Sequence, residues 1–197
     1  YNPQQKSEYN FVPGVIGMIL LLICAMMSSI AIVREKESGT MEVLLASPLP
    51  PACIILAKLV PYFVISCINL AAILLLAFYM LHVPMAGSLI CFLGVTLLYI
   101  LVSLTLGLLI STLVSILSLL LIVPTIYLSG LVFPLESMPA VLRDISAIVP
   151  ARWYIDAARK LMIQGADAVY VAADAAVMAV MEAVLLGVSL KLFKVRL

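Results

Sequence analysis

The chain has 197 residues, of which 65% are hydrophobic and 11% are charged, and its formal net charge is +1. Soluble domains carry about 25% charged residues, so this composition excludes an ordinary water-soluble domain and favours a lipid bilayer as the surrounding solvent. The small net charge gives no reason to expect a nucleic acid as a partner. The cysteines lie in apolar stretches without a metal-binding spacing, and we interpret them as small apolar residues: Cys24, Cys53, Cys67 and Cys91.

The chain opens on a polar segment, 1–11, without an initiator Met and without the pattern of a signal peptide. We expect this segment to be the end of an extracytoplasmic region, and the sequence to be a fragment that starts where an upstream region ends. A first transmembrane helix is predicted at 12–33, because an apolar run of about 20 residues is long enough to cross a bilayer.

A charged and proline-rich connection, 34–50, follows this first span. Gly39 permits a bend, and a short helix is expected after it, with Met41, Leu44 and Leu45 on one face at i, i+3 and i+4 spacing. The prolines that follow end this helix, since a residue before proline avoids the helical region. The residues alone support two interpretations equally: an ordinary loop whose charges fix the topology, or an amphipathic helix that another protein contacts on the cytoplasmic side.

Further transmembrane helices are expected beyond this connection, because residues 59–135 contain no Asp, Glu, Lys or Arg. We place them at 51–82, 88–113 and 114–132. Pro61 is expected to kink the first of these, since proline removes one helical hydrogen bond.

The join between the second and third of these helices is unusual. As a single helix, residues 88–131 would extend about 66 Å, roughly twice the hydrocarbon thickness, so the chain has to turn near 111–118. That stretch has no turn-forming residue other than serine, which leaves a polar connector absent from this sequence, a tight serine-rich turn or a re-entrant pair as explanations. Just before it, Ser103, Gly107 and Ser111 form a face of small residues that favours close helix packing.

A more polar segment, 133–170, precedes a last transmembrane helix at 171–193 and a short tail at 194–197. Basic residues near the span ends put the connection 34–50 and the tail on one side, which we identify as cytoplasmic. The segment 133–170 then lies outside, in conflict with its own basic residues: Arg143, Arg152, Arg159 and Lys160. The conflict is smaller if it re-enters the membrane as short amphipathic helices, with its aromatic residues at the interface: Trp153, Tyr154 and Tyr170.

The stretch REKESGTMEVLLASPL, residues 34–49, resembles the signature of ABC-2 type transporter permeases, R-E-K-E-x-G-T-x-E-x-L-x-x-[ST]-P-[LI], which follows a transmembrane helix. The resemblance implies that this segment is the coupling helix that docks on a nucleotide-binding ATPase subunit. The implied coupling residues are Arg34, Glu35, Lys36, Glu37, Gly39, Thr40, Glu42, Leu44, Leu45 and Pro48, with Ser47 and Leu49 also matching the signature.

A second block, LSGLVFPLESMPAVLRDISAIVPARWYIDAARKLMIQG, also resembles this family, in which it forms short re-entrant helices near the outer leaflet. The re-entrant motif is carried by Phe133, Pro134, Met138, Pro139 and Pro150, and Ser129, Gly130, Arg159 and Gly165 match as well. Members of the drug-export branch usually have one more N-terminal span followed by a large extracytoplasmic domain, and this sequence contains neither. The implied fold is an all-α membrane protein similar to type V ABC exporters, with five transmembrane helices in this chain.

The resemblance implies a permease subunit that moves a hydrophobic or amphipathic, drug-like or lipid-like substrate out of a bacterial cell across the inner (plasma) membrane. No GxxxxGK[ST] phosphate-binding loop is present, so we expect this chain to be no enzyme and to bind no cofactor, with ATP and Mg on the separate ATPase subunit. The other expected partners are a second permease chain in a homo- or heterodimer, membrane lipid and a periplasmic adaptor protein. A permease for polysaccharides or lipid-linked glycans and a non-transporting assembly factor remain alternatives.

Three residues inside the predicted spans are candidates for the substrate path or its gating: the polar residues Asn69 and Glu182, and Pro124, which is expected to kink its helix. A carboxyl group in the membrane could bind a cationic substrate or carry a proton, or it could be a neutral group bonded to a neighbour such as Asn69. Asp174 lies two turns earlier on a similar face, where we expect it at the membrane surface. The lone histidine, His82, is interpreted as an interfacial polar residue.

Overall fold

The computed structural model describes residues 7–37, 50–79, 86–113, 129 and 139–195, and every regular element in these ranges is a helix. The helices are α1 (Ser7–Glu37), α3 (Pro51–Tyr79), α4 (Leu89–Leu113), α6 (Ala140–Ser146), α7 (Pro150–Met162) and α8 (Ala168–Val195). This architecture agrees with the predicted all-α fold.

Four of these helices are long and apolar enough to cross a membrane, with apolar stretches at Phe11–Ile30, Cys53–Tyr79, Leu89–Ile110 and Ala168–Lys191. They correspond to four of the five predicted spans. The other predicted span, 114–132, and the turn near 111–118 lie largely outside the described residues and stay predictions. His82 also lies outside them.

The helix ends differ from the predicted ends mainly at α1 and α8. Helix α1 begins at Ser7, inside the predicted polar segment, and continues to Glu37. Its last turn holds Arg, Glu and Lys, which are good helix formers, so the change from apolar to charged residues does not end the helix. Helix α8 likewise begins before residue 171 and extends to Val195.

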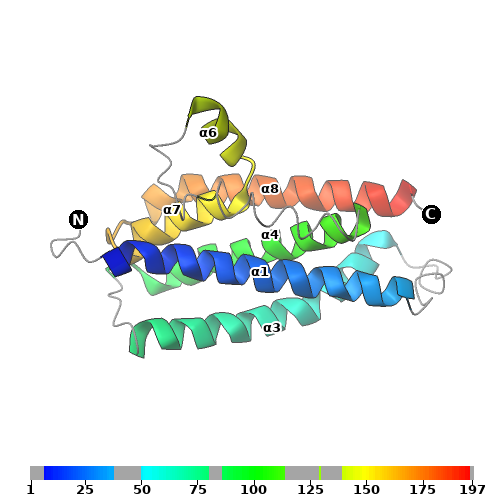
Figure 1. The fold of residues 1–197 in the computed structure, drawn as a ribbon, viewed down its shortest axis with the longest axis horizontal. Coiled ribbons are helices and arrows are strands. Elements are labelled where there is room, and N and C mark those ends of the chain that lie inside the picture. The colour runs from blue at the N-terminus through cyan, green and yellow to red at the C-terminus, as the bar shows by residue number, and fades with distance from the viewer. Residues whose placement is uncertain (1–6, 38–49, 80–85, 114–128, 130–138, 196–197) are drawn as a thin grey trace.

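Helix α4 is the centre of the bundle, with α1 and α8 on either side (Figure 1). Helices α1, α4 and α8 run in the same direction, and α3 runs opposite to them. The central position of α4 explains why residues all around it are buried, including Phe92, Tyr99, Val102 and Leu104. A helix that is apolar on all sides is typical of such a position.

Helices α1 and α4 approach closely at the small-residue face that the sequence indicates. A Cβ atom added to Gly107 of α4 would lie 2.7 Å from the Cα and carbonyl oxygen of Ala25 in α1. Nearby, the Ser28 hydroxyl of α1 donates a 2.8 Å hydrogen bond to the Leu104 carbonyl oxygen. Small residues and a short interhelical hydrogen bond are the contacts that hold membrane helices together.

Helix α3 packs mainly on α1 and contains Pro61 within its length, and the kink expected at this residue stays a prediction. The Cys24 thiol of α1 donates a 3.2 Å hydrogen bond to the Ser66 hydroxyl of α3. Large apolar side chains on the other side of α3 are exposed in this chain, including Val60, Ile68 and Leu76. This pattern is expected of a helix that presents one face to lipid or to another protein.

Two short helices, α6 and α7, occupy part of the segment 133–170 for which such helices are predicted. Pro139 is the N-cap residue of α6 and Pro150 is the first residue of α7, a position where proline's missing N–H is not needed. After α7 the chain turns at Gly165, whose φ of 61° is in the left-handed region that favours glycine. The turn leads directly into α8.

Helix α7 is strongly amphipathic and packs against α1, α4 and α8. Its buried face consists of Pro150, Ala151, Tyr154, Ile155, Ala157, Ala158, Leu161 and Met162. The Tyr154 side chain is completely buried between helices, so it offers no surface to a membrane interface, and its expected depth in the membrane stays a prediction. Tyr170 is 70% exposed and Trp153 is half-buried, so the aromatic residues of this segment do not share one environment.

Candidate functional site

The predicted coupling connection lies at one end of the bundle. The C-terminal end of α1, the first residues of α3 and the C-terminal end of α8 all lie at the right in Figure 1. The helix ends on both sides of the connection 34–50 thus lie at the same end of the bundle as the C-terminal end of α8. Helix α7 lies near the opposite end, beside the beginnings of α1 and α8.

The first part of the predicted coupling residues belongs to α1. Arg34 is exposed, and Glu35, Lys36 and Glu37 continue the same helix. At the other side of the connection, Pro50 accepts a 2.9 Å hydrogen bond from the Cys53 amide at the start of α3. The remaining coupling residues lie outside the described residues: Gly39, Thr40, Glu42, Leu44, Leu45 and Pro48.

Tyr99 of α4 and Tyr154 of α7 form a buried aromatic contact that joins three helices. Their rings stack with centroids 4.1 Å apart and planes 7° apart. The Tyr99 hydroxyl donates to the Gly17 carbonyl oxygen of α1 at 3.0 Å, and the Tyr154 and Thr96 hydroxyl oxygens are 3.2 Å apart. Burial raises the pKa of Tyr154 above its usual value, so its phenol stays neutral. The Tyr99 hydroxyl therefore joins α4 to α1, and the Tyr154 hydroxyl and the ring stack join α7 to α4.

The link between α6 and α7 is held by polar side chains at the start of α7. The Arg152 guanidinium donates 2.7 Å hydrogen bonds to the Arg143 carbonyl oxygen and the Ser146 hydroxyl, and its centre lies 5.4 Å from the Trp153 ring centroid. The Trp153 indole donates to the Ala147 carbonyl oxygen at 2.9 Å. Phe133, Pro134 and Met138 of the predicted re-entrant motif lie outside the described residues.

Glu182 lies in the middle of α8 and faces α4. The Thr105 hydroxyl donates a 2.9 Å hydrogen bond to Glu182 Oε1, while Oε2 is buried and accepts no hydrogen bond from the described part of the chain. The hypothesis that Asn69 is the partner of Glu182 is therefore wrong: Asn69 is half-buried on α3, and Thr105 of α4 takes this role. Pro124, the third candidate for the substrate path, lies outside the described residues.

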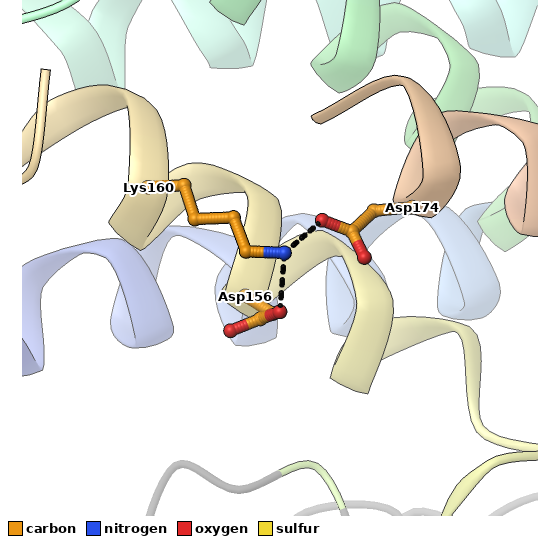
Figure 2. Close-up of polar contacts among 3 residues, drawn as sticks. All are labelled: Asp156, Lys160 and Asp174. Atoms are coloured by element: carbon orange, nitrogen blue, oxygen red, sulfur yellow. Dashed lines mark hydrogen bonds and ion pairs between the residues drawn. The ribbon is translucent and has the colours of Figure 1, made fainter. Parts of the chain in front are cut away.

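Lys160 of α7 lies between two carboxylates (Figure 2). Its ammonium group is 2.9 Å from Asp156 Oδ2, one turn earlier on α7, and 2.7 Å from Asp174 Oδ2 on α8. The Asp174 side chain is only 5% exposed, because α7 covers it, and its expected depth near the membrane surface stays a prediction. Burial lowers the pKa of Lys160, but the hydrogen bonds to Asp174 and Asp156 outweigh this effect and raise it overall. Lys160 therefore remains charged at neutral pH.

One of the two contacts in this ion cluster could be predicted from the sequence. Asp156 and Lys160 have the i, i+4 spacing of a helical ion pair, which predicts their contact once α7 is expected to be a helix. The contact with Asp174 could not be predicted in the same way, because it depends on how the turn at Gly165 folds α8 back against α7.

Residues 1–191 match the model of a family described as ABC-2 family transporter protein. This chain belongs to the ABC-2 family.

Two bacterial relatives of this ABC-2 family chain carry multidrug transport in their names. It is 33% identical over 172 residues to the probable multidrug ABC transporter permease YbhS of Escherichia coli (strain K12), an alignment covering 84% of this chain and 46% of that protein. It is 32% identical over 173 residues to the probable multidrug ABC transporter permease YbhR of the same organism, covering 85% of this chain and 47% of that protein.

A eukaryotic relative is similar over nearly the same part of the chain. The ABC transporter G family member 20 of Dictyostelium discoideum is 27% identical over 170 residues, which cover 83% of this chain and 23% of that protein. The ABC-2 family chain thus spans about half the length of the bacterial relatives that it matches. No solved structure matches it.

Proposed function

We propose that this chain is the membrane-embedded part of a permease subunit in an ATP-driven exporter. The observation that carries the proposal is the charged connection 34–50, which joins α1 to α3 at one end of the bundle in a chain that belongs to the ABC-2 family. In the proposed arrangement this end faces the cytoplasm, and the connection forms a coupling helix that docks on a nucleotide-binding ATPase subunit.

The proposed mechanism transmits force from that partner into the bundle. ATP and Mg²⁺ bind to the ATPase subunit, and its closure moves the connection 34–50. Helix α1 is one continuous helix from Ser7 to Glu37, so a displacement of its charged end is transmitted along the helix toward α4 and α7. Two permease chains, identical or different, then rearrange to open a path between them toward the outside.

The proposed substrate is hydrophobic or amphipathic, either drug-like or lipid-like. The word "multidrug" in the names of two E. coli relatives supports this class over polysaccharides or glycans. A polysaccharide path would need many polar groups to replace water around the sugar hydroxyls.

The coupling role is tested by two substitutions in the full-length protein, Glu42→Arg and Leu44→Asp. The first reverses a charge and the second places a carboxylate on the expected apolar face, so each should weaken docking on the ATPase partner. We expect substrate-stimulated ATPase activity to fall by about tenfold or more, with membrane insertion unchanged, since each substitution opposes about 1.4 kcal/mol or more of contact energy. ATPase activity is measured on the purified complex.

The matched control is Ser38→Ala, at a position in the same connection that the family signature leaves open. It should leave coupling at the wild-type level. Co-purification of a P-loop ATPase with the full-length wild-type chain is the prerequisite. Wild-type coupling in both Glu42→Arg and Leu44→Asp, or failure of any such ATPase to co-purify, contradicts the proposed function.

A further inference from the structure

The ion cluster between α7 and α8 joins two carboxylates in very different surroundings. Asp156 belongs to the same helix as Lys160, and its side chain is 50% exposed. Asp174 belongs to a different helix, and its side chain is 5% exposed. Lys160 itself is 27% exposed, so its ammonium group extends from the surface of α7 into the contact with α8 (Figure 2).

The pair with Asp174 is the contact that matters energetically. An exposed i, i+4 pair such as Asp156 with Lys160 contributes little, because water screens it. A buried carboxylate that loses its cation is left with an uncompensated charge, which is strongly destabilising. If α7 separated from α8 beside this cluster, the Asp174 carboxylate would lose its cation, whereas Lys160 would still have Asp156 as a partner.

Backbone hydrogen bonds hold the C-terminal end of α7 to the segment before α4 and to the turn that follows α7. The Ala86 amide donates a 3.1 Å hydrogen bond to the Met162 carbonyl oxygen, and the Ala166 amide donates to the Lys160 carbonyl oxygen at 3.0 Å. The C-terminal end of α7 is therefore anchored by its backbone on one side and by the Lys160 side chain toward α8. The start of α7 is held separately, by the stack of Tyr154 on Tyr99.

We propose that Lys160 is a positioning residue of the transport cycle: its ion pair with Asp174 fixes α7 to α8, so that the two helices move together when the bundle rearranges. This inference rests on the proposed export function. Lys160 contacts no substrate in this role. It acts through α7, whose position between α1, α4 and α8 determines the packing at that end of the bundle.

The test uses the full-length permease with its ATPase subunit and three variants: Lys160→Met, Asp174→Asn and the double variant. Lys160→Met leaves the buried Asp174 carboxylate without a cation. Asp174→Asn removes that charge and leaves Lys160 with Asp156. Both single variants remove the ion pair, so we expect the ratio of substrate-stimulated to basal ATPase activity, per folded complex, to fall by about tenfold in Lys160→Met and by a similar factor in Asp174→Asn.

The double variant supplies the decisive comparison. Because either single substitution already removes the ion pair, the double variant should lose no more coupling than the single variants do, whereas independent roles of the two residues would multiply the losses. Lys160→Arg keeps a cation at this position and should retain most of the wild-type coupling. Asp156→Asn is the matched control, since it removes the exposed carboxylate from the same cluster and should have little effect.

The outcomes separate this inference from the proposed function. If the wild-type complex shows no substrate-stimulated ATPase activity, the proposed function itself fails. If the wild type is coupled and either single variant is coupled equally well, or if the losses of the two single variants multiply in the double variant, the positioning role is overturned. Should Lys160→Met fail to fold, a normal coupling ratio in Asp174→Asn would overturn it as well.

Discussion

At the scale of single residues, the contact between Thr105 and Glu182 is the most unusual feature of the membrane-spanning part. One carboxyl oxygen of Glu182 accepts a hydrogen bond from Thr105, and the other is buried without a donor from the described residues. A polar group in this position has no water to replace a lost partner, so its single hydrogen bond carries more weight than an average one.

Thr105→Val removes that bond while preserving the shape of the side chain. Interhelical hydrogen bonds in membranes contribute about 0.6 kcal/mol on average. This variant leaves the carboxyl group without a donor from the described residues, so we expect the free energy of unfolding to fall by about 1–3 kcal/mol. Thermal unfolding in detergent measures this loss of stability. Thr105→Ser should behave as the wild type, and Thr105→Val combined with Glu182→Leu should recover most of the loss. No loss in Thr105→Val would show that this hydrogen bond does not stabilise the bundle.

At the scale of helices, the close approach of α1 and α4 depends on Gly107. The atoms that a Cβ would meet belong to the backbone of Ala25, so no side-chain rotation can make room for it. The two helices would have to separate, and the hydrogen bond from Ser28 to Leu104 lies in the part of the interface that would be affected. The proposed transmission of force along α1 depends on the same interface.

Gly107→Ala is therefore expected to destabilise the protein by about 1–3 kcal/mol, the usual range for overpacking. Gly94→Ala is the matched control in the same helix, because a Cβ there meets nothing within 4 Å. It should be neutral or slightly stabilising, since alanine favours a helix over glycine. Melting temperatures of the two variants in detergent provide the measurement. Equal melting temperatures would mean that α1 and α4 can shift apart at no cost.

At the scale of the whole molecule, the three parallel helices α1, α4 and α8 give the bundle two different ends. One end carries the connection 34–50 and the end of α8, and α7 lies near the other. The proposed function requires these ends to lie on opposite sides of the membrane, with the connection in the cytoplasm.

Cysteine labelling tests this arrangement in membrane vesicles of known orientation. Cys53, near the start of α3, is exposed, and Tyr170, near the start of α8, is 70% exposed. In the full-length protein, a background with Cys53 as the only cysteine should react with a membrane-impermeant maleimide from the cytoplasmic side. A background in which Tyr170→Cys supplies the only cysteine should react from the outer side. Labelling of both positions from the same side would contradict the proposed orientation.

Much of the fold could be predicted from the residues in order. Long apolar runs predict α3, α4 and α8 within a few residues of their observed ends, because the length of an apolar helix is set by the bilayer. The prolines at 139 and 150 mark the starts of α6 and α7, because proline suits the first positions of a helix. The limits of α1 were less predictable, since a charged turn can continue a helix as well as end it.

The candidate site was predictable only in part, because it depends on contacts between distant residues. The sequence by itself determined that the chain is a helical membrane protein of the ABC-2 family, through its apolar runs and the motif at 34–49. Only the tertiary structure decided that Tyr154 is buried, that Glu182 faces Thr105 and that Lys160 reaches Asp174. For Glu182 this is because lipid is equally compatible with every face of an apolar helix, so hydrophobic periodicity does not reveal which face of α8 packs inward. The contacts of Tyr154 and Lys160 depend instead on how the amphipathic helix α7 packs against α4 and α8.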